Sequence, residues 1–192
     1  YNVQLKYSYW KDATSSVNEV ASYINGITEY IFDENDVLYA VNALPGTSCS
    51  GAFFSEQTLP AGKYSVVSWA NINGISRVNS PKVFVTRKEE LMLYLDVQAQ
   101  NRVRQSPSSA GTISYNSEKL YYGHRTFRIN DGRISRVNVD MLHAHCILRL
   151  SVRWKNNTPE NTHDFYILYK EIHAVYSFIP EYIHRLGECK LH

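Results

Sequence analysis

The stretch "LPAGKYSVVSWANING", residues 59–74, decides the fold. Pro60 and Gly62 are turn residues, and residues 63–71 after them are rich in the Val, Tyr and Trp that strands favour. At about 3.3 Å per residue, this run spans about 30 Å, enough to cross a domain from end to end. One face would carry Tyr64, Val66, Ser68 and Ala70, and the other Lys63, Ser65, Val67, Trp69 and Asn71. Neither face is wholly polar, so we predict a central strand with Trp69 as its most buried side chain.

The same stretch has the proportions of a glycine-rich catalytic loop, but its residues argue against that chemistry. A phosphate-binding loop needs GxxxxGK[ST] leading into a helix, whereas "PAGKY" leads into a β-branched strand whose N–H groups pair with neighbouring strands. A serine nucleophile elbow needs GxSxG after a strand. The nearest match, "TSCSGA" at 47–52, lacks the first glycine and lies in a Gly/Ser-rich connection. We therefore predict that residues 59–74 are scaffold.

Working outward, further runs show the period of two that marks a strand with one buried face. We predict strands at 2–10, 82–85 and 90–99, a hairpin over 27–44 around the acidic turn 33–36, strands on both sides of the Asp-Gly turn at 130–132, one long segment at 137–154, and one or two strands in 165–180. Residues 45–58 and 105–118 read as connections. A short helix within 15–25 would begin at Ser16, with Glu19 completing a capping box. Roughly nine to eleven short strands predict an all-β sandwich.

Composition excludes several classes. The 20 basic and 18 acidic residues give a net charge of +2 and are scattered singly, so no nucleic-acid partner is expected. No run of 18 apolar residues marks a membrane span. Cys49, Cys146 and Cys189 are widely spaced and lack a CxxC, which is poor material for a disulfide framework. The 15 tyrosines favour β structure.

Histidines are the first candidates for chemistry. His143 and His145 lie two apart and would share one strand face, where His124 could add a third metal ligand. The alternative is that both face solvent while their neighbours face the core. No HExxH motif or suitably spaced carboxylate accompanies them. We predict no metal, no cofactor and no catalytic residue.

Three weaker candidates have simpler explanations. The tail holds His184, Cys189 and His192, but a zinc finger needs four closely spaced ligands. The acidic turn "FDEND" lacks the glycine and the final Glu of an EF-hand. The tyrosines of "KYSYW", residues 6–10, could form a glycan-stacking platform, although tyrosines in an alternating strand more often fill a core.

Five blocks in this order resemble the Bacteroidales fimbrillin superfamily, closest to its FimB-like anchor and accessory lipoproteins. They are "YIFDENDVL" (30–38), "LPAGKYSVVSWANING" (59–74), "LMLYLDV" (91–97), "KLYYGHRTFRI" (119–129) and "VNVDMLHAHCILRLSVRW" (137–154). Each block alone is only a strand with a turn. Together they cover most of the chain.

The resemblance implies a two-domain extracellular protein built from transthyretin-like Greek-key sandwiches. Residues 1–135 would form the first sandwich and 136–192 the start of a second; alternatively, 137–154 closes the first sandwich in a one-domain variant. It also implies attachment to the outer membrane through a lipid-bearing cysteine upstream of this segment, and assembly with other fimbrial subunits by strand exchange.

Three functions follow as hypotheses. The first is a non-catalytic anchor, accessory or tip subunit of cell-surface fimbriae that pairs strand edges with its partners, with the side chains of Val3, Leu5 and Tyr7 entering pockets. The second is a surface adhesin that binds a host protein or glycan. The third is a metal-dependent hydrolase around His143 and His145, which the missing metal motif disfavours.

Overall fold

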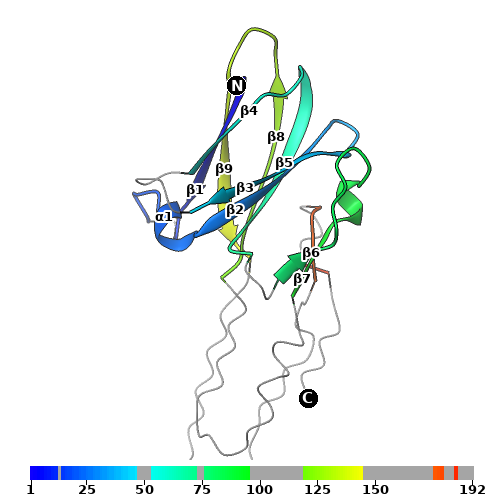
Figure 1. The fold of residues 1–192 in the computed structure, drawn as a ribbon. Helices are drawn as coiled ribbons and strands as arrows, with labels where there is room; N and C mark the ends of the chain where they lie inside the picture. The colour runs from blue at the N-terminus through cyan, green and yellow to red at the C-terminus, as the bar shows by residue number, and fades with distance from the viewer. Residues whose placement is uncertain are drawn as a thin grey trace, which may run out of the picture.

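A computed structural model describes residues 1–12, 14–46, 53–72, 76–95, 119–144, 175–179 and 184–185. In chain order, its elements are β1 (Val3–Tyr9), α1 (Val20–Tyr23), β2 (Gly26–Phe32), β3 (Leu38–Pro45), β4 (Phe53–Gln57), β5 (Gly62–Ala70), β6 (Ser76–Val78), the 3₁₀ turn η1 (Lys88–Glu90), β7 (Met92–Leu95), β8 (Tyr121–Ile129), β9 (Ser135–His143), β10 (Val175–Ser177) and β11 (His184–Arg185) (Figure 1). The all-β prediction is confirmed. Among these residues, none of the helices has the length and hydropathy of a membrane-spanning segment.

The larger sheet has seven strands in the order β3-β2-β5-β8-β9-β1-β4. All its pairs are antiparallel except β1 with β9, which run parallel in register from Val3–Ser135 to Tyr9–Met141. The sheet curls back on itself, because Tyr7 on β1 bonds Glu29 on β2 although three strands lie between them in the sheet order. The two halves therefore enclose one core, as in a sandwich. The specific transthyretin-like Greek-key topology stays a prediction.

A second sheet of four strands, in the order β11-β10-β7-β6, covers part of the outer face of the first. Leu93 of β7 and Tyr176 of β10 join a buried cluster with Val67 and Trp69 of β5. Tyr64 and Val66 belong to the other core, between the two halves of the large sheet. Both faces of β5 are thus buried, which explains why the sequence shows no polar face there.

The prediction for β5 is confirmed: it is a central strand, and Trp69 is fully buried. The strand ends at Ala70, and Asn71 takes a left-handed backbone with φ of 63°. The predicted strand at 2–10, the hairpin over 27–44 and the turn at 130–132 also agree with the structure. Gly132 supplies the positive φ of 73° that this last turn requires.

Three local predictions were wrong. Residues 82–85 form an exposed turn instead of a strand, with Phe84 at φ of 61°. Residues 45–58, read as a connection, contain β4. The helix is only four residues long and begins after Glu19, so Ser16 is not its cap; the Asn18 side chain accepts the Val20 N–H instead.

Several predictions concern residues that lie partly or wholly outside the described ranges. The connection at 105–118 lies outside them, and so does the part of 137–154 beyond residue 144. β9 itself lies inside the large sheet, between β8 and β1. The division into domains at 135 and 136 stays a prediction.

Candidate functional site

The histidines do not come together in the part of the chain that the structure describes. His124 on β8 lines a surface cleft, whereas the His143 ring at the end of β9 packs edge-on against Tyr121 at 5.2 Å. Tyr121 belongs to the inner core, on the other side of the sheet. His145 lies outside the described residues. Within those residues no group of three His, Cys, Asp or Glu side chains has the arrangement of a metal site.

The other predicted candidates are settled only in part. "TSCSGA" at 47–52, Cys189 and His192 fall outside the described residues, and of His184 only the backbone is described, in β11. The tyrosines of "KYSYW" are core residues: Tyr7 is fully buried and Tyr9 nearly so. The structure thus contradicts a glycan platform built from those two rings.

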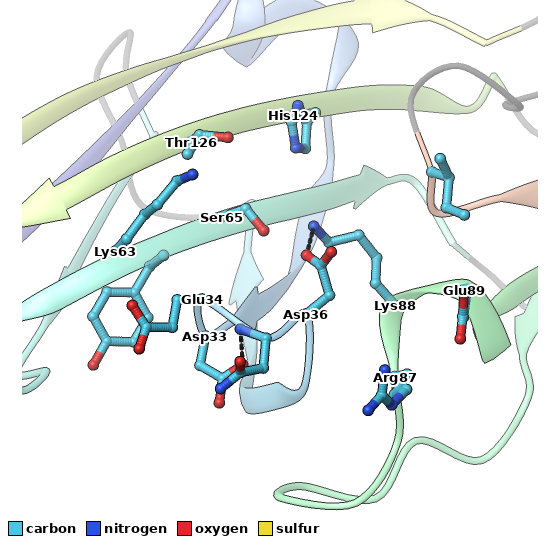
Figure 2. A pocket seen from close by; sticks show the side chains of 13 residues that line it. Asp33, Glu34, Asp36, Lys63, Ser65, Arg87, Lys88, Glu89, His124 and Thr126 are labelled. Atoms are coloured by element: carbon cyan, nitrogen blue, oxygen red, sulfur yellow. Dashed lines mark hydrogen bonds and ion pairs between the residues drawn. The ribbon is translucent and has the colours of Figure 1, made fainter.

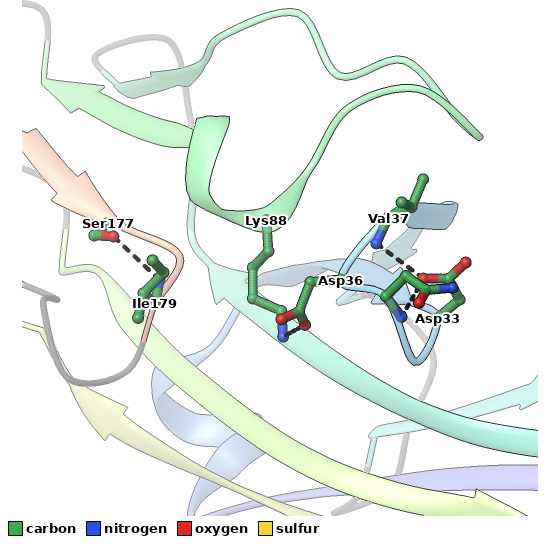
Figure 3. A network of polar contacts seen from close by, with 7 residues as sticks. Asp33, Asp36, Val37, Lys88, Ser177 and Ile179 are labelled. Atoms are coloured by element: carbon green, nitrogen blue, oxygen red, sulfur yellow. Dashed lines mark hydrogen bonds and ion pairs between the residues drawn. The ribbon is translucent and has the colours of Figure 1, made fainter.

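The acidic turn between β2 and β3 is held by its own side chains. The carboxylate of Asp33 accepts the N–H groups of Asn35 and Val37, both at 2.9 Å (Figure 3). Asp36 takes a left-handed φ of 58°, which Asp tolerates better than most residues. These bonds agree with the reading of "FDEND" as turn chemistry.

A cleft with a volume of about 400 Å³ lies beside this turn. Its floor is the outer face of β5 and β8, and its walls are the acidic turn and η1 (Figure 2). The lining residues are Asp33, Glu34, Asn35, Asp36, Lys63, Tyr64, Ser65, Arg87, Lys88, Glu89, His124, Thr126 and Ile179. Residues distant in sequence thus form one polar cleft.

One wall of the cleft is fixed by an ion pair. Lys88 is 8% exposed, and its ammonium bonds the carboxylate of Asp36 while lying 5.2 Å from the Phe32 ring centre. The Lys88 N–H also donates to the Asp36 carbonyl at 2.9 Å. These contacts tie η1 to the acidic turn, so the two walls are one connected unit.

A second polar cluster lies in the core and serves structure. The Glu29 carboxylate is fully buried and accepts hydrogen bonds from Tyr7 and Ser55 at 2.8 Å and from Asn42 at 3.3 Å. Burial raises the pKa of Glu29, while these three donors oppose the rise. Burial also raises the pKa of Tyr7, and the nearby Glu29 charge adds to it. The three hydrogen-bond donors to Glu29 come from β1, β3 and β4, so the cluster joins both halves of the sheet.

The burial of Glu29 could have been predicted from the sequence, although it is not among the predictions above. In "ITEYIF" the side chain alternates with Ile27 and Ile31, so it had to share their buried face. Ser65 and Lys88 gave no such signal. Ser65 and Lys88 line the cleft because the second sheet leaves that part of the outer face of the large sheet uncovered.

The two edges of the large sheet are β3 and β4. β3 is guarded at its start, where Leu38 donates its N–H to Thr86 and accepts from the Phe84 N–H, and at its end by Pro45. β4 pairs only with β1 among the described strands and exposes Phe54 by 46%. β1 is not an edge: Val3, Leu5 and Tyr7 fill the core of their own chain.

Comparisons with known proteins agree on the fold. A candidate adhesin from Bacteroides ovatus aligns with a TM-score of 0.66 at 13% identity, over 97% of this chain and 60% of that one. A candidate adhesin from Bacteroides thetaiotaomicron aligns at 0.59 and 20%, over 74% and 45%. A candidate polysaccharide-binding protein from the same species aligns at 0.56 and 17%, over 73% and 46%. The chain thus spans roughly half the length of these structures. A search of curated proteins found no match.

A family model identifies the chain more directly. It is described as fimbrillin-A associated anchor proteins Mfa1 and Mfa2, and it matches residues 1–178. That range contains all five sequence blocks, so the predicted resemblance to the fimbrillin superfamily is confirmed. Since the match extends over nearly the whole chain, this protein belongs to the family of fimbrillin-A associated anchor proteins Mfa1 and Mfa2.

Proposed function

We propose that this protein is a non-catalytic structural subunit of cell-surface fimbriae, acting as an anchor, accessory or tip protein. The observation that carries the proposal is the family match over residues 1–178. The buried polar cluster around Glu29 is consistent with a structural role, because the three hydrogen bonds to this carboxylate join strands inside the core.

The partner surface in this proposal is the β4 edge. An edge strand offers unpaired N–H and C=O groups, which a strand from another subunit can pair with. β4 has an exposed aromatic side chain, Phe54, beside that edge, whereas β3 is guarded by residues 84–86 and by Pro45. Main-chain pairing would supply affinity, and a pocket for Phe54 would supply specificity.

The two edge strands provide a matched test. Phe54 on β4 and Val41 on β3 are both exposed apolar residues, at 46% and 37%. We expect Phe54→Glu to abolish binding of purified fimbrial subunits in surface plasmon resonance, and Val41→Glu to leave it intact. Both variants should melt as the parent does, because exposed substitutions change stability little. Equal binding by all three proteins would refute the β4 assignment.

We also propose how the chain is organised and attached. The pairing of β9 with β1 and β8 favours the alternative in which the segment from 137 closes the first sandwich. Anchoring to the outer membrane would use a lipid-bearing cysteine upstream of Tyr1. Mass spectrometry of the protein from cell envelopes tests this, with a diacylglycerol-modified N-terminal cysteine as the expected result.

A second candidate function is a surface adhesin that binds a host protein or glycan. Two of the similar structures carry the description of candidate adhesin, and a third that of candidate polysaccharide-binding protein. In this proposal, the polar cleft beside the acidic turn would be the binding site.

A further inference from the structure

The outer face of β5 and β8 changes character along its length. Trp69 pairs in register with Tyr122, and both are buried beneath the second sheet. Ser65 pairs with Thr126 further along the same face, where the polar cleft begins. The sheet is thus apolar where protein covers it and polar where the cleft lies open.

Charges of both signs line the cleft in nearly equal number. Four are acidic, Asp33, Glu34, Asp36 and Glu89, and three are basic, Lys63, Arg87 and Lys88. Lys88 and Asp36 already neutralise each other. An ion of either sign entering the cleft would meet like charges, whereas a neutral ligand rich in hydroxyl groups would find both hydrogen-bond donors and acceptors.

A buried hydroxyl adds an independent sign of a ligand. Ser65 is 6% exposed, and its Oγ has no hydrogen-bond partner among the described residues. The Ser65 hydroxyl points towards the cleft, and the residue lies between Lys63 and the Lys88–Asp36 pair (Figure 2). Because an unpaired buried hydroxyl is costly, such groups in native proteins call for a partner, which a bound molecule can supply.

We propose that this cleft binds a neutral saccharide unit. A space of about 400 Å³ lies in the range of small-molecule sites and suits one or two sugar rings. Ser65 and Thr126 would bond the sugar hydroxyls from the floor, and the carboxylates of Asp33 and Glu34 would accept from the rim. This inference deepens the second candidate function and does not depend on fimbrial assembly.

Saturation-transfer NMR on the full chain tests the cleft. The probes are glucose, galactose, mannose, N-acetylglucosamine, lactose and maltose, with anionic N-acetylneuraminic acid and cationic glucosamine as charged comparators. We expect transfer to at least one neutral sugar and weaker transfer to both comparators. Ser65→Ala and Thr126→Val should each weaken affinity roughly three- to tenfold, the loss expected for one hydrogen bond. Ser8→Ala, which removes a half-buried hydroxyl on β1 outside the cleft, should leave affinity unchanged.

Folding of the variants is checked by thermal melting, and Ser65→Ala removes an unpaired group and so should not destabilise the chain. If the parent binds a sugar and both cleft variants bind it equally well, the cleft is not the binding site, but glycan binding would remain as the function. Stronger transfer to a charged comparator than to every neutral sugar would refute the proposal that the ligand is neutral. No transfer to any sugar would overturn both the cleft and the glycan-binding function.

Discussion

The phenol of Tyr7 on β1 donates a 2.8 Å hydrogen bond to the carboxylate of Glu29 on β2, across the interior of a sheet that has curled round to meet itself. The same phenol lies 2.8 Å from the hydroxyl of Ser68 on β5. β1 is a neighbour of neither β2 nor β5 in the sheet order, so this contact joins the two halves of the sheet. Because all three side chains are buried, this contact should matter for stability.

Tyr7→Phe should lower the free energy of unfolding by about 2 kcal/mol. The change removes one hydroxyl and leaves Glu29 Oε1 short of a donor in a buried site, where a missing hydrogen bond costs most. Urea unfolding followed by fluorescence measures the loss. Tyr1→Phe, at a residue 56% exposed, is the matched control and should change nothing. Equal stability of the two variants would show that the Tyr7 hydroxyl contributes nothing to folding.

Glu29 should make stability fall as pH rises. Burial raises its folded-state pKa above the ordinary value of 4.5, so above that pH the folded chain holds more protons than the unfolded chain. The stabilisation that protonated Glu29 contributes to the folded state is fully present below pH 4.5 and is lost as pH rises through the folded-state pKa. Glu29→Gln cannot titrate, so the stability of the parent relative to this variant should decrease from pH 4.5 upward in urea unfolding. The exposed Glu56→Gln serves as control, and a difference independent of pH would contradict the prediction.

Trp69→Ala should cost about 3–5 kcal/mol. Trp69 is fully buried and packs against Tyr122, Tyr176 and Phe178, with ring centres 4.9, 5.7 and 6.1 Å away. Differential scanning calorimetry should show a lower melting temperature. Trp10→Ala, at a tryptophan 46% exposed, should have a small effect. An unchanged melting temperature for Trp69→Ala would refute its place between the two sheets.

Sequence patterns within a few residues were enough to predict several of the strands. β1 and the β2–β3 hairpin show clear alternation or a turn with the right chemistry, and β5 is marked by its composition. The segment 82–85 has the composition of a strand, but Phe84 takes a positive φ and donates its N–H to Leu38, which makes a turn beside β3. A tertiary contact overrode the propensity of Val83, Phe84 and Val85.

The pairing of strands was beyond local reasoning. Nothing in residues 3–9 indicates that β1 runs parallel to β9, more than 130 residues later, or that it separates β9 from β4. The cleft was invisible for the same reason, because Ser65 and Lys88 become neighbours only through tertiary folding. The pattern of short strands predicted the fold class, but the position of the cleft depends on how distant segments pack together.

Asn71 offers a test that separates backbone conformation from side-chain bonding. Its Oδ1 accepts the Asn25 N–H at 2.7 Å, and its Nδ2 donates to the carbonyls of Tyr23 and Lys119 at 3.0 and 2.9 Å. The residue also has a positive φ of 63°. It therefore ties three segments together just where β5 ends.

Asn71→Gly and Asn71→Ala both remove these three bonds, but only alanine also meets the left-handed backbone with a Cβ. We expect Asn71→Gly to lower the free energy of unfolding by about 2–4 kcal/mol through the buried groups it leaves unpaired. Asn71→Ala should lower it by about 1 kcal/mol more, because the left-handed conformation is strained for alanine. Parallel urea titrations measure both losses. If alanine were as stable as glycine at this position, the positive φ would not be a constraint, and the hydrogen bonds alone would account for the role of Asn71.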